Sequence, residues 1–124
     1  MKKKTDTART VNDILDMQKA VKEIRVTDDV KKYIITIVNA TRGDRNTTFG
    51  ISPRGSIALY KASKAFAYIY EREYVTPDDV KNTAVAVLSH RIILSPQGKT
   101  AYGTSEGYVT ELLQNIPVPA MGIR

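Results

Sequence analysis

The chain has 124 residues, of which 42% are hydrophobic and 26% charged, the composition of one soluble globular domain. No apolar run approaches the roughly 20 residues of a membrane-spanning helix, and no secretory signal pattern opens the sequence. Because there is no cysteine, disulfides, thiolate nucleophiles and cysteine-based metal sites are excluded, and we expect a cytoplasmic protein.

The net charge is +6, from 19 Lys and Arg against 13 Asp and Glu. A basic surplus permits weak nucleic-acid binding. The basic residues are scattered over the polar faces of predicted helices, however, so we interpret the surplus as solubility and do not expect a nucleic-acid partner.

The first predicted helix runs from about Val11 to Ile24 and is capped by Thr10. Residues 1–9 are expected to be a disordered leader or a vector-derived remnant, because the three lysines after Met1 are followed by polar residues. The helix places apolar residues along one side, which is expected to face the core: Val11, Ile14, Leu15, Val21 and Ile24.

The second predicted helix begins after Thr27, with Asp28 and Asp29 in the first turn that the helix dipole favours for acids, and stops near Thr41. Residues 43–48 have the composition of a loop, and Phe49-Gly50 ends that loop.

The third predicted helix runs from Pro53 to about Arg72. Its apolar residues cover nearly the whole circumference, so we expect a central helix that is packed on several sides: Ile57, Leu59, Ala62, Ala65, Phe66, Ala67, Ile69 and Tyr70.

The fourth predicted helix has Thr76 as its cap and Pro77 at its first position, and Asp79 supplies the acidic half of a capping box. The last spans about Ser105 to Ile116, where prolines end it. The inward residues are expected to be Val80, Ala84, Val87 and Leu88 in the fourth helix, and Tyr108, Val109, Leu112, Leu113 and Ile116 in the last.

Three short β-prone pieces lie between the helices: residues 24–26, 74–75 and 91–94. They can pair only as a minor sheet. The predicted fold class is therefore all-α, a small bundle of about five helices with at most a minor two- or three-stranded β element. We expect this helical domain over residues 10–119, followed by a tail at 120–124.

The best indication of function is Ser52-Pro53-Arg54 at the start of the third helix. Ser52 is a favoured N-cap and Pro53 suits the first helical position, so Arg54 falls in the first turn. The helix dipole disfavours a cation there, whereas anions are attracted to the same helix end. The pattern therefore indicates a phosphate-seeking group, although a solvated arginine remains the alternative.

No catalytic centre is evident. His90 is the only histidine, which excludes two-histidine zinc sites, and its expected role is to close the fourth helix. Gly98-Lys99-Thr100 looks like the end of a P-loop, but the required earlier glycine position holds Ile93, and residues 95–97 look like a turn. Asp78 and Asp79 are interpreted as dipole and capping residues.

Taken in order, several segments resemble the C-terminal lid of MoxR-type AAA+ ATPases, over about Thr10 to Pro119. They are Gly50-Ile51-Ser52-Pro53-Arg54, Tyr74-Val75-Thr76-Pro77-Asp78-Asp79-Val80, His90-Arg91, Leu94-Ser95-Pro96 and Ile116-Pro117-Val118-Pro119.

This resemblance implies a small helical domain that folds over ATP and Mg²⁺ bound to a separate α/β core of the same polypeptide. Arg54 would be the second sensor, a catalytic residue that reaches the β- and γ-phosphates, and Ser52, Pro53 and Arg54 would be the cofactor-binding residues of this chain. The family also implies ring-shaped oligomers, usually hexamers, that remodel client proteins. The chain alone is expected to be inactive and to bind no cofactor tightly.

Two residues depart from the alanines common around this motif: Ile51 and Gly55. Gly55 adds local freedom beside Arg54. For Arg91 the resemblance gives no defined role; it could touch nucleotide or a neighbouring subunit, and contact with carbonyls at its own helix end is the simpler expectation.

Two other functions stay open. One is a basic, histone-fold-like nucleic-acid-binding module, because a long central helix followed by residues 75–80 recurs in such folds. That reading predicts a stable dimer and leaves the last forty residues unexplained. The other is an adaptor with no nucleotide link, in which Arg54 is incidental.

Overall fold

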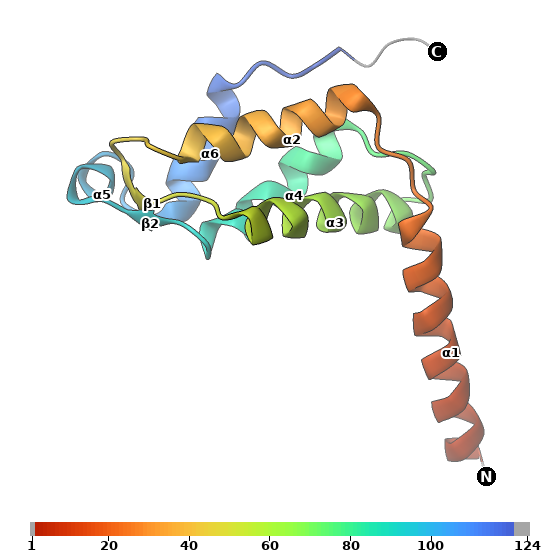
Figure 1. Cartoon of the computed structure of the whole chain (residues 1–124). Helices are drawn as coiled ribbons and strands as arrows, with labels where there is room; N and C mark the ends of the chain where they lie inside the picture. Colours follow the sequence, from red (N-terminus) through yellow and green to blue (C-terminus); the bar gives the residue numbers. More distant parts are fainter. Residues whose placement is uncertain (1, 121–124) are drawn as a thin grey trace.

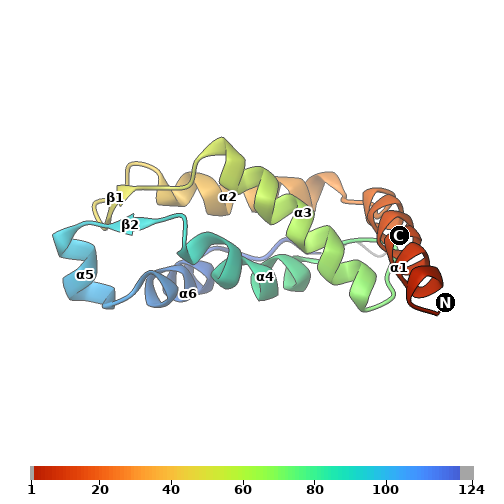
Figure 2. The same cartoon turned by 90° about the horizontal axis from the view of Figure 1, so that it is seen from below.

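The computed structural model describes residues 2–120, with side chains from Thr10 onward. Four helices form a two-layered bundle, in which α2 (Asp28–Thr41) and α3 (Pro53–Ile69) lie over α4 (Pro77–Ser89) and α6 (Ser105–Asn115) (Figure 2). The small sheet and α5 (Pro96–Tyr102) lie at one end of the bundle, and α1 (Lys2–Lys22) projects from the other (Figure 1). The all-α prediction is confirmed.

The core lies between the four bundle helices, where α4 packs on both α3 and α6. Its fully buried residues follow the helical spacing expected from the sequence in α2, α4 and α6. They include Val30, Ile34, Ile37, Val38, Val80, Ala84, Leu88, Tyr108, Val109 and Leu113. No helix in the described range is long and apolar enough to span a membrane.

The predicted starts of α2 and α4 are confirmed at atomic detail. The Thr27 hydroxyl accepts a hydrogen bond from the N–H of Val30. At α4, Thr76 and Asp79 form a reciprocal capping box, and Pro77 is in the first turn. Helix α2 ends at Thr41, as expected. Short polar residues therefore fix these helix boundaries through local hydrogen bonds.

Helix α1 differs from the prediction in both extent and burial. It begins at Lys2, so Thr10 lies inside it and most of the expected leader is helical; no glycine or proline precedes Lys22 to break it. The division of the chain into leader, lid and tail stays a prediction, and residues 121–124 lie outside the described range. The expected inward face is wrong for Val11, Ile14 and Leu15, which are about half exposed because α1 leaves the bundle.

Helix α3 is also less enclosed than predicted, and it ends at Ile69 rather than near Arg72. Leu59 and Ala67 are fully buried, but Ile57 and Ile69 are exposed. Apolar residues all around a helix therefore do not prove burial on all sides, because here only one face meets α2 and α4.

The end of the bundle opposite α1 holds two elements that the sequence did not indicate. Ser95 caps α5, with its hydroxyl accepting from the N–H of Gly98, so the expected turn is a helix. The expected loop contributes strand β1 (Thr47–Phe49), which pairs antiparallel with β2 (Ile93–Leu94). The other predicted β pieces meet in one bridge between Arg25 and Tyr74.

Two partly buried polar contacts hold separate elements together. The Arg72 guanidinium binds both carboxylate oxygens of Asp79 at 2.5 Å, which raises the pKa of Arg72 and joins the end of α3 to the start of α4. The hydroxyl of Tyr108 donates to Asp44 at 2.5 Å and so holds the loop after α2 on α6. Burial, followed by this bond to a carboxylate, raises the pKa of Tyr108 well above its usual value.

The two buried tyrosines offer a matched test of what a buried hydroxyl contributes. Tyr108→Phe should lower the free energy of unfolding by about 1.5–3 kcal/mol, because the bond to a charged acceptor is lost. Tyr33→Phe should leave it unchanged or raise it slightly, because the Tyr33 hydroxyl is buried without a partner in the described structure. Urea unfolding of both variants measures this; equal losses would contradict it.

Candidate functional site

The start of α3 is built as the sequence predicts. Ser52 has extended backbone angles (φ −78°, ψ 168°), and its hydroxyl accepts a hydrogen bond from the N–H of Gly55 at 3.3 Å. Its carbonyl accepts from the N–H of Ser56 at 3.1 Å. Since Pro53 has no N–H, the N–H of Arg54 is the one donor of this turn without a partner among the described residues. The helix end itself therefore offers little to an anion, and side chains must supply the rest.

The segment before this cap is fastened to the end of α2. The hydroxyl of Thr41, which is fully buried, accepts from the N–H of Ile51 at 2.9 Å and donates to the carbonyl of Val38 at 2.7 Å. The Nε of Arg42 donates to the carbonyl of Ile51 at 2.7 Å. Both backbone groups of Ile51 are thus held by neighbouring residues of α2's last turn, which fixes where α3 begins.

The segment before α3 also passes so close to the backbone at the end of α2 that position 50 must be glycine. A Cβ on Gly50 would lie 2.4 Å from the carbonyl oxygen of Thr41, far inside van der Waals contact. Sequence reasoning missed Thr41 and Arg42, the two residues that clamp Ile51 through hydrogen bonds to its backbone. The available signal was a Thr-Arg pair at a helix end followed, after a loop, by glycine.

The departures at Ile51 and Gly55 compensate each other. A Cβ on Gly55 would lie 2.6 Å from Cγ2 of Ile51, whose side chain is 1% exposed. The larger side chain at position 51 therefore occupies the space that an alanine at position 55 would need. Gly55 is buried and its N–H is capped, so the freedom that the sequence suggested beside Arg54 is removed by packing.

Arg54 is exposed, and its guanidinium has no hydrogen-bond or ion-pair partner in the described part of the chain. Arg91 approaches the same turn, since its Cδ would lie 3.4 Å from a Cβ on Gly55. The expected contact of Arg91 with carbonyls at its helix end is wrong for the side chain: only its backbone N–H binds Leu88. Arg54 therefore lies uncompensated in the first turn of α3, and the side chain of Arg91 approaches the next residue, Gly55.

The remaining candidates have structural roles. His90 is exposed and is the C-cap residue of α4, as expected. Gly98 belongs to α5, where a Cβ would lie 2.0 Å from the carbonyl oxygen of Asn46, so close packing and not phosphate binding explains this glycine. Within residues 10–120, no three acidic or histidine side chains gather in a way that could hold a metal ion.

A comparison with known families identifies this helical arrangement. The AAA lid domain family matches residues 39–111, which include the clamp at Thr41, the Ser-Pro-Arg turn and α4. The chain belongs to this family.

Individual relatives refine the identification of this AAA lid domain. It is 40% identical over 107 residues to the protein YeaC of Bacillus subtilis (strain 168), covering 86% of this chain and 33% of that protein. It is 27% identical over 119 residues to Chaperone MoxR1 of Mycobacterium tuberculosis, covering 89% of this chain and 32% of MoxR1.

The fold of the AAA lid domain also recurs in a solved structure. A crystal structure of a candidate ATPase from Cytophaga hutchinsonii superposes with a TM-score of 0.80 at 28% identity, covering 88% of this chain and 36% of that one. These matches confirm the resemblance to the lid of MoxR-type AAA+ ATPases and give no support to the histone-like alternative. The chain spans about a third of the length of the relatives it matches.

The compensation between positions 51 and 55 predicts a strong coupling in a double-mutant cycle. Gly55→Ala should lower the free energy of unfolding by about 1–3 kcal/mol, because the new methyl overlaps Ile51. In an Ile51→Ala background the same change should be neutral or stabilising by up to about 1 kcal/mol, since alanine is the better helix former. Chemical denaturation of the four proteins measures the cycle; additive effects would contradict it.

Proposed function

We propose that this chain acts as the lid of an ATP-driven remodeller and that Arg54 contacts the phosphates of ATP as a second sensor. The observation that carries the proposal is an exposed guanidinium without a partner, in the first turn of a firmly anchored helix. A cation is disfavoured there in the absence of an anion. A bound phosphate would supply the missing negative charge.

The chemistry of guanidinium suits this role. It stays charged at all physiological pH values, and its fork of donors matches phosphate oxygens. Negative charge spreads over the equatorial oxygens of the γ-phosphoryl group during transfer, so a cation at that position favours the transition state. Ser52 and Pro53 contribute by fixing the turn, since the hydroxyl of Ser52 is already used as the cap.

The rest of the nucleotide site must come from elsewhere in the assembled protein. No cluster of metal-binding side chains is found in the described residues, so we assign Mg²⁺ and most ATP contacts to an AAA+ core of the same polypeptide. We propose that the full-length protein forms a cytoplasmic ring, usually a hexamer in this family, and remodels a client protein. The name of the relative Chaperone MoxR1 supports the remodelling role.

Arg54→Ala in the full-length protein tests the assignment. Hydrolysis should fall about 10-fold or more, since a charge contact to the phosphoryl group is lost, while the amount of folded protein stays the same. Initial rates of phosphate release and equilibrium ATP binding should be measured separately. Lys61→Ala, which removes an exposed cation further along α3, is the control and should leave both unchanged. Unchanged hydrolysis in Arg54→Ala would exclude the sensor role.

The isolated chain provides a second test. It should be monomeric and helical and should bind ATP only very weakly, because one or two arginines cannot replace a phosphate-cradling core. An NMR titration with ATP should show no submillimolar affinity. Tighter binding would place the nucleotide site within these residues and contradict the division of roles.

A further inference from the structure

The joint between α1 and the bundle is confined to a few residues. Helix α1 ends with backbone bonds from Glu23 to Ala20 and from Ile24 to Val21, both at 3.1 Å. Arg25 already belongs to the bundle, because its N–H donates to Glu73 and its carbonyl accepts from Val75, both at 2.9 Å. A change in the direction of α1 must therefore occur between Lys22 and Arg25.

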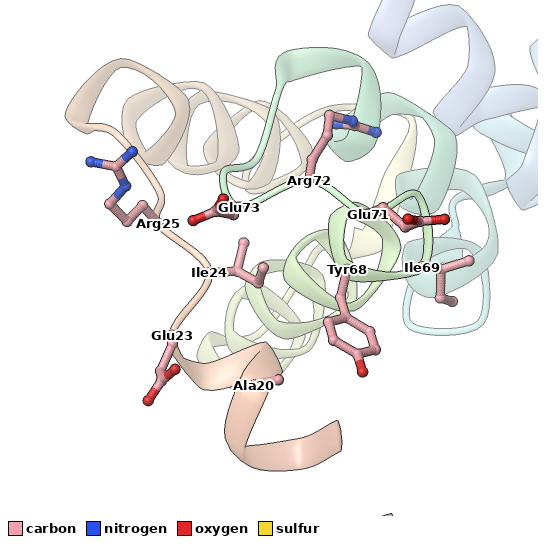
Figure 3. A pocket seen from close by; sticks show the side chains of 9 residues that line it. All are labelled: Ala20, Glu23, Ile24, Arg25, Tyr68, Ile69, Glu71, Arg72 and Glu73. Atoms are coloured by element: carbon pink, nitrogen blue, oxygen red, sulfur yellow. The ribbon is translucent and has the colours of Figure 1, made fainter. Parts of the chain in front are cut away.

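Hollows flank this joint on two sides. One of about 750 Å³ lies between the end of α1 and residues 68–73, with Ile24 and Tyr68 beside it (Figure 3). The other, of about 880 Å³, is lined by Tyr60, Lys64 and Tyr74. Both share residues 23–25. Because both hollows are open to solvent, they leave α1 room to change its angle.

One side chain bridges the joint. The Nζ of Lys64, on α3, donates to the carbonyl of Lys22, the last residue of α1, at 2.8 Å. Lys64 is only 9% exposed, and its Nζ lies 5.3 Å from the ring centroid of Tyr60. No acidic side chain pairs with Lys64 among the described residues. Its charge is therefore balanced by the negative end of α1 and by an aromatic ring.

We propose that Lys64 is a positioning residue that latches α1 to the bundle and so sets the direction in which α1 leaves the lid. If α1 swung away, the Lys64 ammonium would exchange the carbonyl of Lys22 for water and lose its attraction to the negative end of α1, which disfavours the open position. The latch therefore holds α1 in one orientation although the hollows leave space for others.

The latch also gives the proposed sensor a way to act on α1; this coupling rests on the proposed function. Arg54 and Lys64 lie on the same helix, ten residues and thus roughly 15 Å apart along its axis. Because α3 is fixed to α2 at its start and to α4 just beyond its end, contact of Arg54 with phosphate would move the bundle as one rigid body, and the latch would carry α1 with it. The lid would then pass the nucleotide state on to α1.

The latch can be measured in the 124-residue chain itself, which has no cysteine. Spin labels at Asp16→Cys on α1 and Asn82→Cys on α4, both exposed, report the angle of α1 as a distance distribution. Lys64→Met, which keeps the apolar stem, should widen the distribution about twofold, whereas Lys64→Arg, which retains a donor, should keep it narrow. Lys61→Met is the matched control on the exposed face of α3 and should change nothing.

An unchanged distribution in Lys64→Met with native helix content would overturn the latch. If that variant does not fold, Lys64→Leu, which also lacks a donor, replaces it with the same expectations. The full-length protein separates the two proposals. Lys64→Met should leave ATP affinity within about twofold of wild type but widen the label distribution both with and without ATP. Normal hydrolysis in Arg54→Ala with a widened Lys64→Met distribution would refute the sensor and leave the latch intact.

Discussion

The hydrogen bonds from the last turn of α2 to Ile51 are the constraint on which the candidate site depends. Thr41 accepts from the N–H of Ile51, and Arg42 donates to its carbonyl. These bonds fix both backbone groups of the residue that precedes the Ser52 cap, so the loop between α2 and α3 cannot shift the start of α3. An exposed arginine can act as a sensor only if its backbone is held in this way.

The partners of the charged groups separate structural residues from functional candidates. Arg72 neutralises Asp79, and Tyr108 donates a hydrogen bond to Asp44, which is distant from it in the sequence. Arg54 and Arg91, by contrast, approach one turn with no acidic partner in the described structure. The start of α3 is therefore where an external anion would gain most from these cations.

Helix α3 connects the two features that we consider functional. Its first turn carries Arg54, and its middle carries Lys64, which binds the end of α1. The bond between Arg72 and Asp79 follows the end of α3 and joins it to α4. A helix held at its start and just beyond its end moves as one body, so the sensor and the latch are mechanically coupled through its backbone.

Much of this fold could be predicted from the sequence, because local chemistry fixes it. Ser, Thr and Asp before an apolar pattern define the starts of α2, α3 and α4, and helical spacing identifies the buried faces of α2, α4 and α6. The same reasoning located Arg54. Residues 95–97 are predicted to form a turn, yet the same Ser-Pro signal at Ser95 caps α5, a helix of seven residues.

Only the tertiary structure decided which apolar faces find a partner. Val11 and Ile57 fit amphipathic patterns yet are exposed, since a pattern specifies one face of a helix but not whether another element covers it. Three contacts likewise depend on closeness in space and not in sequence. Thr41 bonds to Ile51, Ile51 fills the space beside Gly55, and Lys64 bonds to the end of α1. No local propensity encodes such contacts, so the sequence determined the helices and the candidate arginine, and packing decided how each is held.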